Sequence, residues 1–146
     1  PFTLTARKLG YNTLIDMAQL NIPYQLTVLV AMRSYIKEHP DIVQAAVTAL
    51  SEAIHYYKRE KEPTIKILSK YLKTDDREAL EETYREVALK VLPEKPYPTL
   101  AGIQTVLDEY SKRFPKAKTM RPEEFVDSSF VKKLDDDGFF DRLYKR

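Results

Sequence analysis

The feature that most constrains the fold is a long amphipathic stripe in the first half of the chain. The sequence His39-Pro40-Asp41 is typical of a helix start, because proline is tolerated in the first turn and an acid lies near the positive end of the helix dipole. Apolar residues then recur at helical spacing over about six turns. These residues are Val43, Val47, Leu50, Ile54 and Tyr57, with Ala46 and Ala53 beside them. The pattern predicts a helix that buries one face.

Further helices are predicted on both sides of this stripe. A short helical turn over residues 4–9 is expected to end at Gly10. Pro63 opens another helix, and the spacing of Asp75 and Glu78 matches a capping box for the next one. Three prolines end that helix, after which Thr99 can cap the following element. The apolar stripes are expected at Ile65, Leu68 and Leu72, then at Leu80, Tyr84, Val87 and Val91, and then at Leu100, Ile103, Leu107, Tyr110 and Phe114. A last short helix, capped by Asp127 and ended by Gly138, is expected to carry Phe130, Val131 and Leu134.

Two segments near the beginning of the chain predict short β-strands. The segment Asn12 to Asp16 is the first, and Leu26 to Met32, which is nearly continuous in hydrophobicity, suits a strand that is covered on both faces. The predicted fold class is therefore α/β, mostly helical with two or more short strands. Two strands leave exposed edges unless further strands pair with them. The sequence therefore predicts a fragment of an α/β protein whose sheet begins upstream.

The first residues support the same expectation. The chain begins Pro1-Phe2-Thr3, without an initiator methionine, a basic region or an apolar signal core. We expect it to be part of a longer chain; the alternative is the processed N-terminus of a mature protein.

Composition restricts the possible partners. The 24 Lys and Arg residues nearly balance the 22 Asp and Glu residues and are interspersed with them, which predicts a solvated surface and no binding to nucleic acid. One basic cluster, from Lys112 to Arg121, is interpreted as a solvated loop. The run from Leu26 to Met32 is far shorter than the roughly 20 residues of a membrane-spanning helix. The absence of cysteine excludes disulfides and thiolate metal sites.

Residues suited to catalysis are scarce. The two histidines, His39 and His55, form no motif, so a surface or capping role is favoured over a metal ligand or a base. The run Asp135-Asp136-Asp137-Gly138 has oxygen ligands before a glycine but lacks the spacing of a calcium loop, and a solvated helix end is favoured. We therefore expect no enzyme, no catalytic residue, no metal site and no cofactor.

Several short segments together resemble a known family. Ala6 to Tyr11, Leu14 to Asp16, Ile22 to Gln25 and Val28 to Val30 resemble the C-terminal half of nitrate/sulfonate/taurine-type substrate-binding proteins of ABC importers, which are related to binding proteins for thiamine-pyrimidine precursors. Ser34 to Val43 and Ala49 to Lys58 are similar to the helices that follow there. Phe125 to Val131, with Gly138-Phe139, is similar to the closing segment.

The resemblance implies a C-terminal fragment of a two-lobed, periplasmic-binding-protein-like fold that captures a small organic solute, anionic ones included, between its lobes. Residues 1–25 would then form the end of the second lobe and the return crossover, and residues 26–146 the C-terminal part of the first lobe. The implied partners are the solute and the membrane permease of the importer, and the fragment is expected to associate with itself or with the missing N-terminal part. The implied location is periplasmic or extracellular, with the full-length protein associated with the membrane.

The resemblance also implies which residues approach the solute. Phe2 and Thr3 lie where a loop enters a helix, whose backbone N–H groups can hold an anion, and Tyr24 and Gln25 lie in the crossover. Tyr24 stands out from its own position as well, because most other tyrosines, such as Tyr57, Tyr84 and Tyr110, fall on helix stripes and are interpreted as packing residues. The alternative function is a stand-alone helical interaction or regulatory module.

Overall fold

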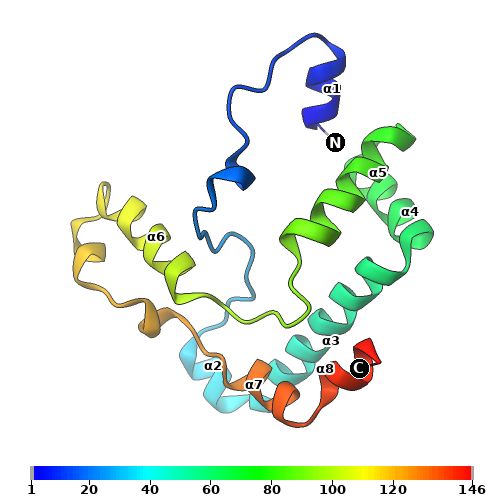
Figure 1. Ribbon diagram of the computed structural model, residues 1–146. Helices are drawn as coiled ribbons and strands as arrows, with labels where there is room; N and C mark the ends of the chain where they lie inside the picture. The colour runs from blue at the N-terminus through cyan, green and yellow to red at the C-terminus, as the bar shows by residue number, and fades with distance from the viewer. Residues whose placement is uncertain (1, 146) are drawn as a thin grey trace.

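A computed structural model describes residues 2–145 of the chain (Figure 1). The α-helices in chain order are α1 (Phe2–Lys8), α2 (Arg33–Glu38), α3 (Pro40–Arg59), α4 (Lys61–Leu72), α5 (Arg77–Glu86), α6 (Leu100–Ser111), α7 (Ser129–Asp136) and α8 (Phe139–Tyr144). Short 3-10 helices cover Met17–Leu20, Pro115–Thr119 and Pro122–Phe125, and a π-helical turn, Val87–Val91, continues α5. The helices follow an open arc, with α5 and α4 on one arm, α3, α7 and α8 at the base and α6 on the other arm (Figure 1).

The predicted α/β class is wrong, because residues 2–145 contain helices and no β-strand. Asn12 to Asp16 and Leu26 to Met32 are irregular in the structure, and their apolar side chains are exposed: Leu14 is 92% exposed and Val30 84%. The physical reason is that a strand exists only with a paired neighbour. No backbone hydrogen bond joins residues 26–31 to another segment of the described chain.

The helix predictions are largely confirmed. α1 ends as expected at Gly10, whose φ of +87° only glycine adopts without strain, and the amide of Tyr11 donates back to the carbonyl of Ala6. α3 begins at Pro40, and its inner face is buried at Ser51 and Ile54.

The start of α5 lies one residue later than predicted. Asp76, not Asp75, accepts a hydrogen bond from the amide of Ala79 at 3.1 Å, whereas Asp75 accepts from the hydroxyl of Ser69. The prediction of buried residues in this stripe is wrong at Val91, which is 65% exposed. The π-helical turn adds a residue to the repeat and brings Ala88, 4% exposed, to the inner face instead.

A lysine stabilises the end of this π-helical turn. The amine of Lys58 in α3 donates to the carbonyl oxygens of Ala88 and Leu92, at 2.8 Å each, and the hydroxyl of Tyr84 donates to the carbonyl of Lys58. Carbonyl groups at a helix end lack intrahelical partners, so the amine satisfies two of them. This contact joins α3 to the chain that leaves α5.

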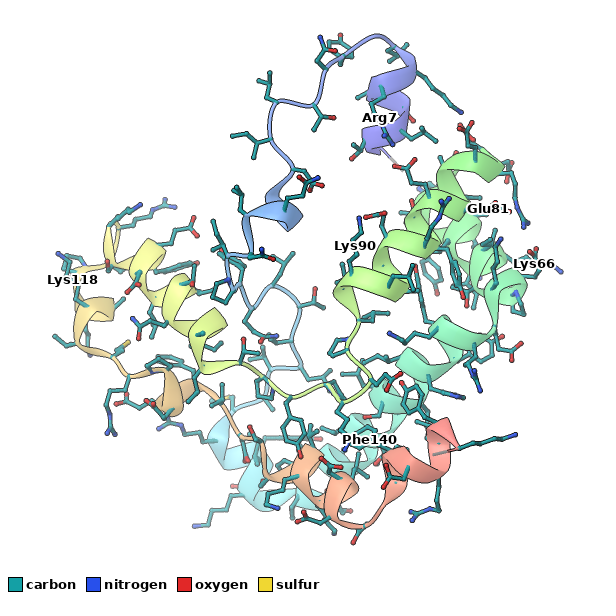
Figure 2. All side chains as sticks on the ribbon, in the orientation of Figure 1. Arg7, Lys66, Glu81, Lys90, Lys118 and Phe140 are labelled. Atoms are coloured by element: carbon teal, nitrogen blue, oxygen red, sulfur yellow. The ribbon has the colours of Figure 1, made fainter. Side chains whose placement is uncertain are left out.

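A hydrophobic core cluster lies where α3, α7 and α8 meet. Phe140, 2% exposed, packs there with Val131 and Leu134, and partly buried apolar residues surround them (Figure 2). Burial of a phenylalanine of this kind stabilises the folded chain by about 1.5–3 kcal/mol. The base of the arc is therefore held together by apolar packing.

Much apolar surface elsewhere is uncovered. The accessible surface is 11135 Å², whereas a compact monomer of 17.0 kDa exposes about 7,700 Å². The excess of about 3,400 Å² is comparable to the area buried in an obligate interface. The α6 stripe contributes to it, because Tyr110 and Phe114 stack on each other but are each more than half exposed. No helix within residues 2–145 is both long and apolar enough to cross a membrane.

Candidate functional site

Two of the predicted solute contacts, Tyr24 and Gln25, are attached to α6. The Gln25 side-chain oxygen accepts a hydrogen bond from the amide of Thr99 at 3.0 Å, and the Gln25 amide donates to the carbonyl of Gly102 at 3.4 Å. The hydroxyl of Tyr24 donates to the carboxylate of Glu109 at 3.0 Å. The connector therefore lies along α6 and is bound at both ends of the helix. We call these contacts the α6 clamp.

The sequence explains locally why the clamp forms on α6. Thr99 caps the helix by accepting a hydrogen bond from the amide of Gly102 at 3.2 Å. Gly102 leaves room for the connector, because a β-carbon at this position would lie 2.9 Å from the amide nitrogen of Gln25 and 2.5 Å from the Thr99 hydroxyl. A glycine inside a helix, which costs stability by itself, is therefore explained by a close approach of two backbones.

Electrostatics keep Tyr24 protonated. The hydrogen bond to the Glu109 carboxylate, together with its negative charge, raises the pKa of Tyr24 above the ordinary value of 10.0. The hydroxyl is therefore a hydrogen-bond donor at neutral pH. It lies beside an acid, which disfavours an anion at this place.

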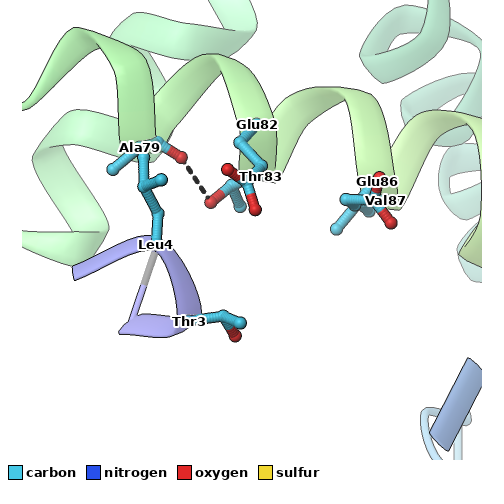
Figure 3. A pocket seen from close by; sticks show the side chains of 7 residues that line it. All are labelled: Thr3, Leu4, Ala79, Glu82, Thr83, Glu86 and Val87. Atoms are coloured by element: carbon cyan, nitrogen blue, oxygen red, sulfur yellow. Dashed lines mark hydrogen bonds between the residues drawn. The ribbon is translucent and has the colours of Figure 1, made fainter. Parts of the chain in front are cut away.

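Thr3 lines a cavity between α1 and α5. The cavity has a volume of about 170 Å³ and is lined by Thr3, Leu4, Ala79, Glu82, Thr83, Glu86 and Val87 (Figure 3). The hydroxyl of Thr83 is already used, since it donates to the carbonyl of Ala79 at 2.7 Å. The two carboxylates in the lining are both ion-paired, Glu82 with Arg7 and Glu86 with Lys90, so the cavity offers no unpaired cation to an anionic solute, and α1 is only seven residues long. The side chain of the fourth predicted contact, Phe2, lies outside the described part of the structure.

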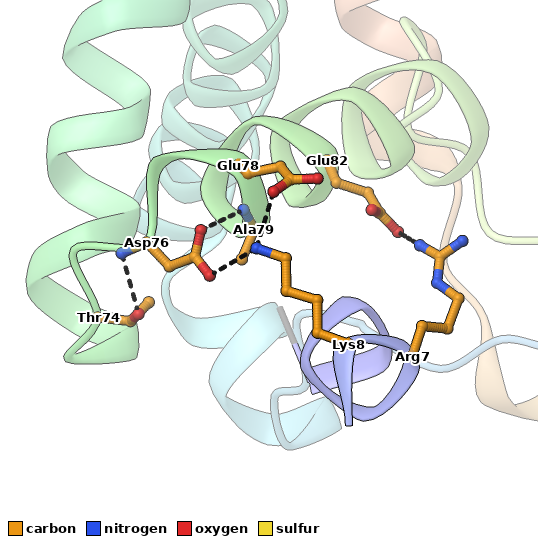
Figure 4. A network of polar contacts seen from close by, with 7 residues as sticks. All are labelled: Arg7, Lys8, Thr74, Asp76, Glu78, Ala79 and Glu82. Carbon is orange, nitrogen blue, oxygen red and sulfur yellow. Dashed lines mark hydrogen bonds and ion pairs between the residues drawn. The ribbon is translucent and has the colours of Figure 1, made fainter. Parts of the chain in front are cut away.

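Ion pairs attach α1 to the beginning of α5 (Figure 4). Arg7 pairs with Glu82, and the Lys8 amine pairs with Glu78 at 2.7 Å and with Asp76 at 3.2 Å. Hydrogen bonds to Glu78 and Asp76 raise the pKa of Lys8. The same carboxylate of Asp76 caps α5, and the hydrogen bond from the Ala79 amide lowers its pKa. The polar contacts of α1 therefore hold this helix on α5.

The structure does not bring the predicted contacts together. Thr3 lies against α5 and Tyr24 against α6, and among the described residues α1 packs on α5 and not on α6. Figure 1 shows α5 and α6 on opposite arms of the arc.

Sequence reasoning missed a polar cluster at the base of the arc. The carboxylate of Asp135 accepts hydrogen bonds from the Lys95 amine at 2.5 Å and from the Tyr97 hydroxyl at 3.1 Å. The hydrogen bond from Lys95 lowers the pKa of Asp135, and the reciprocal contact raises the pKa of Lys95. Lys95 also lies over the ring of Phe140, 5.9 Å from its centre. Asp135, which the sequence predicted as part of a solvated helix end, instead fixes the proline-rich connector on α7.

The histidines take part in aromatic packing. The ring of His39 lies 4.8 Å from that of Tyr35, and His55 meets Tyr144 edge-on at 4.9 Å. Within residues 2–145 no three histidine, cysteine or acidic side chains are grouped to hold a metal ion.

Comparisons with known proteins leave the family open. No protein-family model matches the sequence, and no curated protein and no solved structure shows significant similarity to it.

Proposed function

We propose that this chain takes part in the capture of a small organic solute for an ABC importer. The observation that carries the proposal is the α6 clamp next to a long uncovered segment. Tyr24 and Gln25 hold one point of the connector on a helix, while the residues on both sides of it expose apolar side chains. A connector at a solute site shared with a further polypeptide has this character, because it is fixed at one point and is covered only when that polypeptide is present.

The uncovered segment supports the proposal that a partner polypeptide covers this part of the chain. Between residues 9 and 32 the exposed large apolar side chains include Leu9, Tyr11, Leu14, Ile15, Leu26, Leu29, Val30 and Met32, each more than half exposed. Soluble monomers rarely leave so much contiguous apolar surface in water. We infer that the partner, either the remainder of the same protein or a second polypeptide, buries these side chains.

The charges near the clamp narrow the class of solute. Carboxylates lie beside Tyr24 and in the cavity of Thr3. Because like charges repel, a neutral pyrimidine is favoured over nitrate or a sulfonate beside the Glu109 carboxylate.

The test uses the protein that the complete gene encodes. Its melting temperature is measured with pyrimidines, nitrate, sulfonates and aromatic acids, since a ligand that binds only the folded state at 100 times its Kd adds about 2.7 kcal/mol of stability. The proposal expects a saturable rise with one solute, and at least a tenfold weaker Kd when Tyr24 and Gln25 are both replaced by alanine. Tyr71, 75% exposed on α4, provides the control substitution Tyr71→Ala.

Two results would overturn the proposal. One is the absence of any rise in melting temperature across the four solute classes. The other is an unchanged Kd in the double variant, which would remove the clamp from the solute site. A stand-alone interaction module, which the uncovered segment also suits, is favoured if a stable complex with a protein partner forms while no solute binds.

A further inference from the structure

The end of α6 and the chain that follows it carry a concentration of positive charge. Five Lys or Arg residues and no acid lie between Tyr110 and Pro122, although the net charge of the whole chain is only +2. The remainder of the chain is therefore net negative. Figure 2 shows Lys118 at the outer edge of the α6 arm and Lys66 on the opposite arm. We call the five cations the basic tip: Lys112, Arg113, Lys116, Lys118 and Arg121.

Most of the basic tip lacks a counter-ion. Arg121 pairs with Glu124 at 3.3 Å, whereas the other four cations are exposed and form no ion pair with any residue in the range 2–145. The two acids that precede the tip already accept hydrogen bonds, Asp108 from the amide of Gln104 at 2.7 Å and Glu109 from Tyr24. Neighbouring cations repel one another, so the tip is stabilised by an anionic partner.

A buried residue holds the tip in place. Ala117 is only 8% exposed, and its amide donates to the carbonyl of Phe114 at 2.9 Å. The short 3-10 helix Pro115–Thr119 packs back on α6 through this turn. Lys116 and Lys118, which flank Ala117, are both exposed. The folded chain therefore displays these cations on its surface.

Two aromatic rings belong to the same end of α6. Tyr110 and Phe114 stack with their centres 5.5 Å apart and their planes 18° from parallel, and they are 58% and 53% exposed. Lys112 and Arg113 lie between them in the sequence. Exposed rings beside cations are typical of segments that lie at a bilayer interface, where rings enter the boundary of the acyl chains and amines stay with the phosphates.

We propose that the basic tip docks on an anionic lipid surface, with its cations on the headgroup phosphates and the two rings at the headgroup boundary. Single-stranded nucleic acid is the competing polyanion, and its bases stack on open ring faces. In this structure Tyr110 and Phe114 each cover one face of the other, which favours the lipid surface. The proposal does not depend on solute capture, because Tyr24 and Gln25 are not part of the tip.

The experiment measures co-sedimentation of the protein that the complete gene encodes with lipid vesicles. One set of vesicles contains phosphatidylcholine alone, and the other contains two parts phosphatidylcholine to one part phosphatidylglycerol. We expect binding to the anionic set alone, and weaker binding as salt screens the attraction. Each cation near such a surface strengthens binding about fivefold, so Lys116→Gln combined with Lys118→Gln should weaken it about 25-fold. Phe114→Ala should weaken it about fivefold through lost apolar contact.

Matched changes on α4 provide the controls. Lys66→Gln combined with Lys70→Gln removes the same charge at two exposed residues, and Tyr71→Ala removes a ring that is 75% exposed. Both variants should bind the anionic vesicles as the parent does.

Three results would overturn the proposal. The first is that the protein binds neither set of vesicles, or both equally. The second is that the α4 variants lose as much binding as the tip variants, which would leave net charge as the only cause. The third is that a single-stranded oligonucleotide binds, and is lost in the tip variants, while the vesicles do not bind; the tip would then belong to nucleic acid.

Discussion

Replacing Gly102 by alanine tests whether the connector truly lies on α6. At most positions inside a helix alanine is more favourable than glycine by about 1 kcal/mol. Here the added β-carbon would lie 2.9 Å from the backbone nitrogen of Gln25, closer than real β-carbons approach other atoms. Either the connector or the Thr99 cap must move.

The magnitude follows from the contacts that are lost. Release of the Thr99 cap costs about 1 kcal/mol, and loss of the Gln25 hydrogen bond to the Thr99 amide costs about 1 kcal/mol more. The helix propensity of alanine returns about 1 kcal/mol. We therefore expect Gly102→Ala to lower the free energy of unfolding by about 1 kcal/mol, where an uncrowded helix position would raise it by the same amount.

The assay is urea unfolding followed by circular dichroism, combined with amide hydrogen exchange at Thr99. Ala101, exposed one residue earlier on α6, gives the matched control: Ala101→Gly should cost about 0.5–1 kcal/mol from propensity alone, with unchanged protection at Thr99. In Gly102→Ala the protection at Thr99 should fall. A variant that is more stable than the parent, with Thr99 still protected, would refute the clamp.

Three further predictions concern the core and the ionised groups. Phe140→Ala should lower the free energy of unfolding by about 3–5 kcal/mol, whereas Phe125→Ala, at a side chain 52% exposed, should cost far less; equal losses would contradict the position of the core. Because the pKa of Asp135 is lowered in the folded chain, the contribution of its ionised carboxylate to the stability of the fold is fully present above the ordinary pKa of 3.8. This contribution is lost as the pH falls below that value. Asp135→Asn should therefore destabilise the chain at about pH 7 but hardly at about pH 2, as measured by urea unfolding; a loss that does not depend on pH would argue against the ion pair. Glu109→Gln should bring the pKa of Tyr24 down towards 10.0, measured by ¹³C NMR of the ring, and an unchanged titration would show that the two groups do not meet.

The helices were predictable because their signals are local. Proline at the start of α3, a glycine after α1 and the threonine cap of α6 act within one or two turns, and all three are where the sequence places them. The spacing of apolar residues was equally informative for α3. These features depend on the segment itself and on few distant contacts.

The strands and the polar contacts were not predictable in the same way. Leu26 to Met32 has the composition of a strand, but a strand also needs a paired neighbour, and none lies within the described chain. The pairing of Asp135 with Lys95, and that of Tyr24 with Glu109, joins residues 40 and 85 positions apart. No local pattern indicates such contacts; of the four residues, the sequence singled out Asp135, through its acid run, and Tyr24, through its position in the connector, but predicted neither partner.

The uncovered segment from Leu26 to Met32 has a consequence for the solubility of the chain. Seven consecutive residues without charge or proline, rich in β-branched and aliphatic side chains, form a sequence that readily pairs with copies of itself in fibrils. Arg33 follows this segment immediately, a charge of the kind that natural sequences place beside such runs to slow aggregation. Burial of these residues by another polypeptide would therefore also protect the chain against aggregation.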